Sequence, residues 1–495
     1  MKNIVVIGSG FAGLSTACFL AKAGFAVTVV EKQATPGGRA RQLIQDGFIF
    51  DIGPSWYWMP DVFERFFNEF QKKVSDYYSL DRLDPSYRIY WQDGEMNVPA
   101  NYNELKNLFE SIEQGSGVQL DKFLAEANYK YQVGINKLVH KPGQSITEFL
   151  DWDVIKGVFK LDVFTNMKKH VGKYFKNPKL QQLMEFPVLF LGALPQNTPA
   201  LYSLMNYADI KLGTWYPQGG MYKIVEGMYS LANELGVKFE FNSDVQQIDV
   251  VDGKAKSITY NQTNQQLPIT VSADVVISAA DYHFTETKLL PEKSRTYSNE
   301  YWNKRTMAPS CLLYYIGVNK KLKNILHHTL FFDTDFGVHG KEIYDSPAWP
   351  TDPLFYVSAT SVTDKTTAPI GSENLFFLIP VASGLQGDTE ELRDKYFDKI
   401  VKRFEEKIGE KIIDNIVYKK SYSVSNFVHD YNSFRGNAYG LANTLMQTAV
   451  LKPSCKSKKV INLFYTGQLT VPGPGVPPSL ISGEVVAKEV IKYLK

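Results

Sequence analysis

Hydrophobic residues occur along this chain in short apolar runs that are separated by longer amphipathic stretches. Residues 4–7 form a β-branched run, the pattern of a strand that is buried on both faces. Residues 14–23 then have the pattern of a helix that closes at Gly24, and residues 26–30 form a second apolar strand that ends at Glu31. Strand, helix and strand in direct succession predict a βαβ unit at the start of the chain.

Similar apolar runs return much later in the sequence. We expect a helix at residues 223–235, strands at residues 237–241, 273–278 and 460–465, and a closing helix at residues 479–493. Two long inserts separate the segments that we expect to share one domain. Residues 76–215 contain amphipathic helical stretches, and residues 285–455 alternate strands with helices. The pattern predicts an α/β protein in which one domain is assembled from separate segments of the chain.

Composition agrees with a folded protein of more than one domain. The chain has 495 residues, of which 44% are hydrophobic and 21% charged, and this length exceeds what one compact core holds. The formal net charge is +2 with acids and bases interspersed, which disfavours nucleic acid as a partner.

Cysteine and histidine usage gives no sign of a metal site or a disulfide framework. The three cysteines lie far apart and none belongs to a Cys-x-x-Cys pair, which fits a reduced, cytoplasmic compartment. The seven histidines include the neighbours His327 and His328 but lack metal-ligand spacing beside an acid. We interpret the histidines as isolated surface residues.

The first strand leads directly into a glycine-rich loop, Gly8-Ser9-Gly10-Phe11-Ala12-Gly13. Gly8 permits a tight turn, and Gly10 allows a pyrophosphate to approach backbone amides at the helix N-terminus, where the helix dipole favours anions. Gly13 lets the helix pack closely on the strand. Glu31, at the end of the second strand, is placed to accept hydrogen bonds from the ribose hydroxyls of adenosine. The complete strand–loop–helix–strand context predicts a dinucleotide site.

Two segments beyond Glu31 favour FAD over NAD. Pro36-Gly37-Gly38-Arg39-Ala40 combines a Gly-Gly turn that exposes backbone amides with an arginine able to place a cation near a diphosphate. Phe50-Asp51-Ile52-Gly53-Pro54-Ser55 follows it. Together with the glycine loop, this arrangement resembles the extended FAD motif of the flavin amine oxidase and phytoene desaturase superfamily.

The resemblance implies further cofactor contacts. It implies that Val245 hydrogen-bonds the adenine through its backbone. Near the C-terminus, the N-terminus of the last helix would offer amides and positive potential to the flavin N1–C2=O region and stabilise the anionic reduced flavin. The candidate cofactor-binding residues are Gly8, Gly10, Phe11, Ala12, Gly13, Glu31, Lys32, Gly38, Arg39, Gly53, Pro54, Ser55, Val245, Gly467, Gln468, Gly475, Val476 and Pro477.

The C-terminal segment points to one family within this superfamily. Residues 462–467, the run Pro472-Gly473-Pro474-Gly475-Val476, and Ser482 resemble the C-terminal signature of bacterial-type phytoene desaturases. Residues 53–63 resemble the segment that follows their FAD motif, and the likeness extends with gaps over essentially the whole chain. Departures from the commonest signature leave the substrate and the number of desaturation steps open. They are Gln468, Leu469, Val471 and Pro474.

The resemblance implies a discontinuous Rossmann-like FAD-binding domain, a mixed-sheet substrate domain and a helical lid. We assign residues 1–75, 216–284 and 456–495 to the FAD-binding domain, residues 76–215 to the lid and part of the substrate domain, and residues 285–455 to the substrate-binding domain.

The sequence also limits the chemistry. It has one glycine fingerprint and no dithiol, so we expect electrons to come from the organic substrate and to leave to a quinone or dioxygen. Dehydrogenation of adjacent saturated carbons fits this limit, since flavin N5 takes a hydride while a base or solvent takes the proton. No catalytic side chain is identified. Asp51 and Asp281 lie near the cofactor segments, but we interpret them as helix caps or turn stabilisers.

We therefore expect an FAD-dependent phytoene desaturase that acts on a long-chain polyisoprenoid. The alternatives are a desaturase of the C30 counterpart or of a hydroxylated carotenoid, a flavin amine oxidase, and a non-catalytic carrier of prenylated partners. The C-terminal loop has no cysteine to tether a flavin, which disfavours the amine oxidase. The intact glycine loop and Glu31 disfavour the carrier.

A substrate of this kind resides in the bilayer, so the resemblance implies peripheral contact with a membrane surface, at the inner face of the cell membrane. Residues 155–194 are the candidate contact because lysines there are interleaved with aromatic and aliphatic residues that could enter the interface. A lysine-rich solvent face is the competing interpretation. The lysines are Lys156, Lys160, Lys168, Lys169, Lys173, Lys176 and Lys179.

Overall fold

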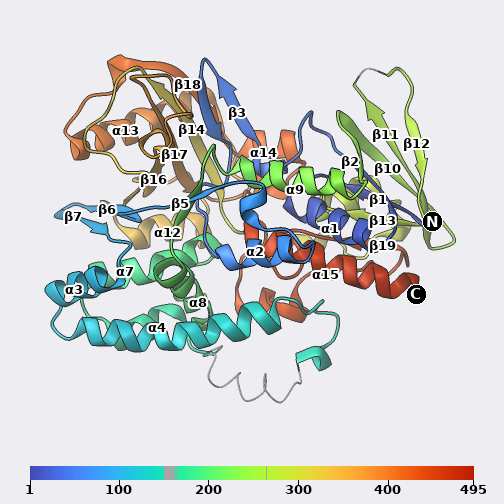
Figure 1. Ribbon diagram of the computed structural model, residues 1–495, viewed down its shortest axis with the longest axis horizontal. Coiled ribbons are helices and arrows are strands. Elements are labelled where there is room, and N and C mark those ends of the chain that lie inside the picture. Colours follow the sequence, from blue (N-terminus) through green and yellow to red (C-terminus); the bar gives the residue numbers. More distant parts are fainter. Residues whose placement is uncertain (150–161, 163, 264) are drawn as a thin grey trace.

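The computed structural model describes residues 1–149, 162, 164–263 and 265–495. Figure 1 shows a parallel sheet with its helices at one end of the molecule and a larger mixed sheet with its helices at the other. Lys156 and Lys160 lie outside the described residues.

The parallel sheet has five strands in the order β19-β13-β1-β2-β9, so distant parts of the chain lie side by side. In β1, Ile4 and Val6 face the helices, while Val5 and Ile7 face a small antiparallel sheet. Burial on both faces explains the uninterrupted apolar pattern of this strand. The strands are β1 (Asn3–Ile7), β2 (Ala26–Val30), β9 (Lys238–Glu240), β13 (Val275–Ser278) and β19 (Leu463–Tyr465).

Helices cover one face of the parallel sheet, and an antiparallel sheet covers the other. Helix α1 contacts both α9 and α15 (Figure 1). At Gly483 of α15 an added Cβ would lie 2.6 Å from the Ala12 carbonyl oxygen, so these two helices require glycine at their contact. The elements are α1 (Phe11–Lys22), α9 (Tyr222–Glu234), α15 (Val476–Leu494), β10 (Ser243–Val251), β11 (Lys254–Gln262) and β12 (Ile269–Ser272). The predicted βαβ unit is confirmed. The later strands and helices expected in the same domain are confirmed as well, with small shifts at their ends.

The mixed sheet has seven strands in the order β18-β14-β17-β16-β15-β6-β7. One face packs on α13 through residues such as Leu312 and Phe377, and the other presents Leu313 and Leu378 to the interior of the molecule. The elements are β6 (Tyr87–Trp91), β7 (Gly94–Val98), β14 (Ser310–Val318), β15 (His328–Phe331), β16 (Phe355–Ser358), β17 (Glu373–Val381), β18 (Ile416–Tyr422), α12 (Phe336–Tyr344) and α13 (Glu390–Ile408).

The first insert is less helical than its pattern suggested. It begins with β5, β6 and β7, and β6 and β7 extend the mixed sheet. The turn between them is Gln92-Asp93, and β7 begins at Gly94, so the Asp93-Gly94 pair is a hairpin signal that the periodicity of the longer helices obscured. Helices α3, α4, α6, α7 and α8 follow, and α3, α4, α7 and α8 lie together in Figure 1. The elements are β5 (Leu80–Arg82), α3 (Tyr102–Ile112), α4 (Ser116–Val133), α6 (Met167–Tyr174), α7 (Pro178–Glu185), α8 (Leu204–Tyr207) and β8 (Trp215–Pro217).

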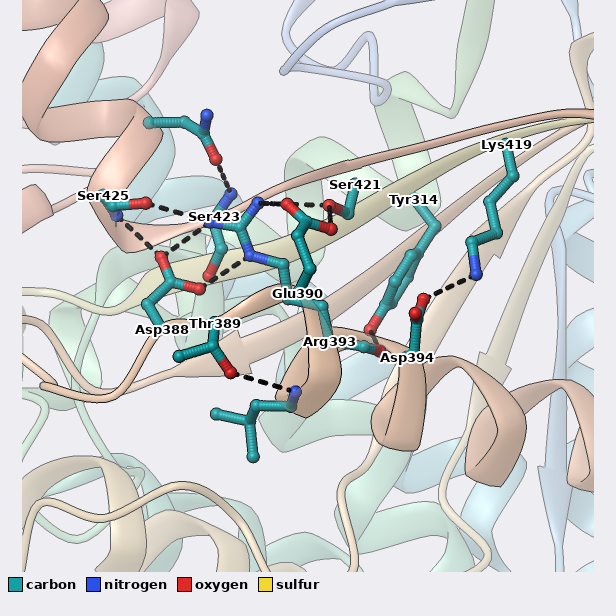
Figure 2. Close-up of polar contacts among 12 residues, drawn as sticks. Tyr314, Asp388, Thr389, Glu390, Arg393, Asp394, Lys419, Ser421, Ser423 and Ser425 are labelled. Carbon is teal, nitrogen blue, oxygen red and sulfur yellow. Dashed lines mark hydrogen bonds and ion pairs between the residues drawn. The ribbon is translucent and has the colours of Figure 1, made fainter.

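A buried polar network joins the start of α13 to β18 and α14 (Figure 2). Arg393 donates from Nε and Nη2 to both carboxylate oxygens of Asp388, at 2.7 and 2.9 Å. It also donates to the hydroxyls of Ser421, at 3.1 Å, and Ser425, at 2.9 Å. Arg393 thereby anchors the helix that covers one face of the mixed sheet. The remaining elements are β3 (Gln42–Gln45), β4 (Phe48–Asp51), α2 (Pro60–Asn68), α10 (Tyr282–Phe284), α11 (Asn299–Asn303) and α14 (Val424–Tyr431).

Candidate functional site

A cavity of roughly 400 Å³ opens beside the carboxyl ends of β1, β2 and β13, where ligands bind in open α/β sheets. Every candidate cofactor-binding residue except Gly13 lines it, although these residues come from both ends and the middle of the chain. Gly13 lies within α1 and contacts the loop instead. The structure therefore brings the predicted contacts together in one place.

The three glycines of the loop have different surroundings. Gly8 has φ +95°, a conformation that favours glycine. An added Cβ at Gly10 would meet no atom within 4 Å, because this position faces the cavity, whereas at Gly13 it would lie 2.0 Å from the Gly8 carbonyl oxygen. The first amides of α1 have no acceptor within the helix and adjoin the open space at Gly10. This geometry fits a pyrophosphate.

Glu31 lines the cavity, and its carboxylate already accepts hydrogen bonds from the protein. One carboxylate oxygen accepts hydrogen bonds from the backbone N–H and the hydroxyl of Ser9, both at 2.7 Å, and the other accepts from the Gln33 N–H at 2.9 Å. A carboxylate can accept about four hydrogen bonds, so capacity for a ribose hydroxyl remains. Ser9 therefore positions the carboxylate of Glu31, a role that its place in the glycine loop does not indicate.

Arg39 is half-buried next to Gln468. Its Nη2 donates to the Ser433 hydroxyl at 3.0 Å, and its Nε has no hydrogen-bond partner among the described residues. With its amide oxygen toward Arg39, Gln468 accepts from Nη2 at 2.9 Å and donates to the Tyr439 carbonyl oxygen at 3.2 Å. Burial lowers the pKa of Arg39, and the nearby Asp281 opposes that shift. A half-buried guanidinium in the wall of the cavity fits an anionic or oxygen-rich ligand.

The C-terminal loop reaches the cavity from the opposite side. Gly475, with φ +113°, precedes α15, and Pro477 occupies its first turn, where no backbone donor is needed. The Gly467 N–H donates to the Ser482 hydroxyl at 2.9 Å, which ties the turn after β19 to α15. The positive end of a 19-residue helix therefore adjoins the cavity.

Other predicted residues line the cavity as follows. The β10–β11 register shifts just after Val245, which leaves an irregularity at this point of the strand. At Gly53 an added Cβ would lie 2.3 Å from the Arg39 carbonyl oxygen, so the two FAD-motif segments approach closely only with glycine there. Lys32 donates from Nζ to the His429 carbonyl oxygen at 2.9 Å. Taken together with the glycine loop and Arg39, the residues present fit FAD.

Asp51 and Asp281 act as caps, which confirms their interpretation. Asp51 accepts from the Met221 and Tyr222 N–H groups at the start of α9, at 2.7 and 3.0 Å, and burial raises its pKa to about 7. Asp281 accepts from the Phe284 N–H at 3.0 Å at the start of α10.

Beyond the predicted residues, the cavity extends to the inner face of the mixed sheet. Its wall there is formed by Trp56, Trp58 and Met59 after the FAD motif and by Cys311, Leu313, Tyr356 and Leu378 from three strands. A second cavity of roughly 90 Å³ adjoins it, with an almost wholly apolar lining that includes Leu194, Leu330, Phe336 and Ile343. Tyr356, Leu378 and Tyr439 line both cavities.

Buried hydrogen bonds hold the aromatic wall in place. The Trp56 ring stacks on His328 at 4.2 Å between ring centres, and the Tyr356 hydroxyl lies 2.6 Å from His328 Nδ1. Trp58 Nε1 donates to the Thr214 hydroxyl at 2.8 Å, which in turn donates to Asp209 at 3.2 Å. These contacts fix the orientation of the aromatic rings in the wall.

The interpretation of the histidines as surface residues is wrong for several of them. His327 and His328 are buried, and burial lowers the pKa of His327 to about 3. His170 and His339 are buried as well. A strand as short as β15 offers no periodicity long enough to reveal that His328 faces inward.

The lysine-rich segment is only partly as expected. Lys168, Lys169, Lys173 and Lys176 are exposed, whereas Lys179 is half-buried and pairs with Asp93 at 2.8 Å. The expectation that apolar residues between 183 and 194 enter a membrane interface is wrong, because Leu183, Met184, Phe186, Val188 and Leu194 are buried in the protein. Among the described residues, helices that combine the length and the apolar character of a membrane span do not occur.

Comparison with known proteins agrees with this site. The sequence model that describes the flavin-containing amine oxidoreductase family matches residues 11–491 of this chain. A carotenoid 3,4-desaturase of Haloarcula japonica is 42% identical over 99% of this chain and 98% of its own. A zeta-carotene-forming phytoene desaturase of Myxococcus xanthus is 30% identical over 99% of this chain and 94% of its own. A 4,4'-diapophytoene desaturase of Staphylococcus aureus is 30% identical over 100% and 99%.

Solved structures show the same fold at low identity. An oxidoreductase from Methanosarcina mazei superposes with a TM-score of 0.61 at 15% identity, covering 98% of this chain and 100% of its own. A double mutant of a putrescine oxidase superposes with a TM-score of 0.62 at 12% sequence identity, covering 99% of each chain. The family match and the fit of the cavity identify FAD as the cofactor. The chain belongs to the flavin-containing amine oxidoreductase family and, within it, to the carotenoid desaturases.

Proposed function

We propose that this protein is an FAD-dependent desaturase of carotenoids, which introduces a conjugated double bond into a long polyisoprenoid. The observation that carries the proposal is the continuity of two spaces: the FAD-lining residues and an apolar, aromatic wall of the mixed sheet enclose the same cavity. When bound, FAD supplies the hydride acceptor at N5. The protein's own residues orient an apolar chain against it and exclude water.

Within this class we favour a reaction near one end of the chain. The second cavity is far smaller than the roughly 300 Å³ at which pockets begin to hold drug-sized molecules, so it suits only the end of a long chain. The relative that is 42% identical is a 3,4-desaturase, whereas the phytoene and diapophytoene desaturases are 30% identical. Both observations support end-group desaturation over the phytoene reaction expected from the sequence.

Expression in hosts that accumulate one carotenoid each tests the proposal. Separate hosts would carry phytoene, its C30 counterpart, a more desaturated acyclic carotenoid, and a hydroxylated derivative of it. We expect conversion of a desaturated C40 substrate, detected as a product two mass units lighter with longer-wavelength absorption. Conversion of phytoene would assign the earlier reaction. Inertness toward all four, with peroxide formation from amines, would contradict the proposal.

The second cavity yields a prediction at Gly340 of α12. An added Cβ there would lie 2.5 Å from Leu194 Cδ2, so Gly340→Ala displaces Leu194 and narrows the space for the chain end. We expect kcat/KM to fall by about tenfold, the lower range for one methylene-sized change in an apolar pocket. Gly337→Ala in the same helix is the control, because Gly337 is exposed and lies outside the cavity. Equal activity of both variants at unchanged FAD content would show that the chain end lies elsewhere.

We also propose peripheral attachment to the inner face of the cell membrane, with a quinone or dioxygen as electron acceptor. Exposed Lys168, Lys169 and Lys173 on α6 lie close in sequence to Phe164, whose surface is 82% exposed, and this combination suits an anionic lipid surface. Replacing the three lysines with glutamine should reduce flotation with anionic liposomes severalfold and leave flotation with neutral liposomes unchanged. Undiminished flotation of the triple variant would assign attachment to another surface.

A further inference from the structure

Lys452 is a buried cation for which the proposed reaction has no role. Its side chain belongs to the segment before β19, and the residue is only 4% exposed. Nζ donates to Asn443 Oδ1 at 3.0 Å, and within the described part of the chain no carboxylate lies within ion-pair distance of it. Burial lowers the pKa of Lys452 to about 7. An ammonium group buried with a neutral partner is costly unless an anion lies near it.

The position of Lys452 relates it to the cofactor cavity. Its Nζ lies 3.0 Å from the place that a Cβ on Gly473 would occupy, directly under the loop whose next residues line the cavity. The neighbouring residue Pro453 accepts a hydrogen bond from the Thr470 hydroxyl at 2.7 Å, and Thr470 also lines the cavity. Lys452 therefore packs behind the loop that leads into α15.

Two sources of positive potential thus lie on one side of the cavity: the α15 N-terminus at its wall, and Lys452 behind the loop that leads into α15. The N-terminus of α15 begins at Val476, three residues after Gly473, and its unpaired amides point out of the helix. When protonated, Lys452 adds a full positive charge in surroundings that screen it little. We propose that Lys452, together with the α15 N-terminus, stabilises the anionic reduced form of the bound flavin and so raises its reduction potential. This role concerns the cofactor and holds whichever carotenoid is the substrate.

Potential measurements on the FAD-loaded protein test this role. With a dye of known potential as reference, Lys452→Met should lower the equilibrium constant for two-electron reduction about tenfold, which is about 30 mV. Lys452→Arg keeps the charge and should stay within about threefold of wild type at pH 6. Lys402→Met, which removes an exposed lysine of α13, is the control and should leave the constant unchanged. A Lys452→Met protein with wild-type FAD content and a constant within twofold of wild type would overturn the proposal.

The pH dependence gives a second test that needs no methionine variant. Reduction adds two electrons and one proton to the flavin, and a neutral Lys452 would take up a second proton at Nζ because the new anion favours the ammonium. Uptake of one proton lowers the equilibrium constant for two-electron reduction tenfold per pH unit. Above pH 7 the constant of the wild-type protein should therefore fall more steeply than this. Lys452→Arg cannot lose its proton and should return to tenfold per unit. The same slope in both proteins would overturn the proposal.

Other titratable groups around this segment do not mimic that signal. Cys455 on the same segment has its pKa raised to about 12 by burial, with Glu489 and Glu148 contributing. Tyr282 and Tyr297, which bond to Ser454, have pKa values raised by burial above the ordinary value for tyrosine. Asp51 titrates near pH 7 but is retained in both proteins of the comparison, so its contribution cancels.

Discussion

Replacing Arg393 with methionine is expected to lower the free energy of unfolding by about 3–5 kcal/mol, the usual effect of removing one partner of a buried ion pair. Arg393 is 4% exposed and holds both oxygens of Asp388 (Figure 2). Methionine would leave that carboxylate buried with the Ser425 N–H, at 2.8 Å, and the Ser425 hydroxyl as its partners. Denaturant unfolding of the FAD-loaded protein, followed by fluorescence and by flavin release, measures the change.

Two companion variants separate charge from packing. Lys402→Met on the exposed side of α13 should change stability by no more than about 0.5 kcal/mol. Combining Arg393→Met with Asp388→Leu should recover much of the loss, because neither charge is then left buried alone. A loss below about 1 kcal/mol for Arg393→Met alone would mean that the network contributes little.

The same network predicts how stability depends on pH. Burial opposes the charge of Asp388, but the hydrogen bonds from Arg393 and Ser425 outweigh it, so its pKa is lower than usual in the folded protein. The contribution of Asp388 is then complete above its unfolded value of about 3.9 and is lost as the pH falls through the folded value. In Arg393→Met the burial of Asp388 is no longer outweighed, so its pKa is higher than in wild type. The difference in stability between the two proteins should therefore be largest near pH 7 and shrink as the pH falls toward pH 4 and below.

Such networks illustrate what the sequence could not reveal. The glycine loop was predictable because its chemistry depends on neighbouring residues and on backbone conformation, and Gly8, Gly10 and Glu31 lie where the βαβ pattern implies. Arg393 and Asp388 are also close in sequence, yet charged residues at the start of a helix usually face solvent, so their burial carries no local signal.

The substrate wall was hidden for a related reason. Cys311, Tyr356 and Leu378 belong to strands that pair only in the folded protein, and each strand is apolar on both faces. Periodicity therefore predicts strands within residues 285–455 but does not show which of their faces lines the cavity. The second cavity depends in addition on α12 and on residues near Leu194, which the sequence suggested as a membrane contact.

Gly10 and Gly13 allow cofactor binding and folding to be tested separately, although they lie in one loop. Gly10→Ala is expected to fold as wild type, because φ is −69° and an added Cβ meets no protein atom within 4 Å. The same methyl group would occupy the space needed by the pyrophosphate, so we expect FAD affinity to fall at least about 100-fold, or about 2.7 kcal/mol. Titration of the deflavinated protein with FAD measures the affinity, and thermal unfolding of the same protein checks its stability.

Gly13→Ala should behave differently, because its Cβ would lie 2.0 Å from the Gly8 carbonyl oxygen, a backbone atom that cannot rotate away. Helix α1 would have to shift from β1, which lowers the stability of the flavin-free protein by about 1–3 kcal/mol or more. FAD affinity falls as well, but only because the loop is displaced. If Gly10→Ala binds FAD normally, the pyrophosphate does not lie at the start of α1. If Gly13→Ala is as stable as wild type without FAD, the close contact between helix and strand is not required.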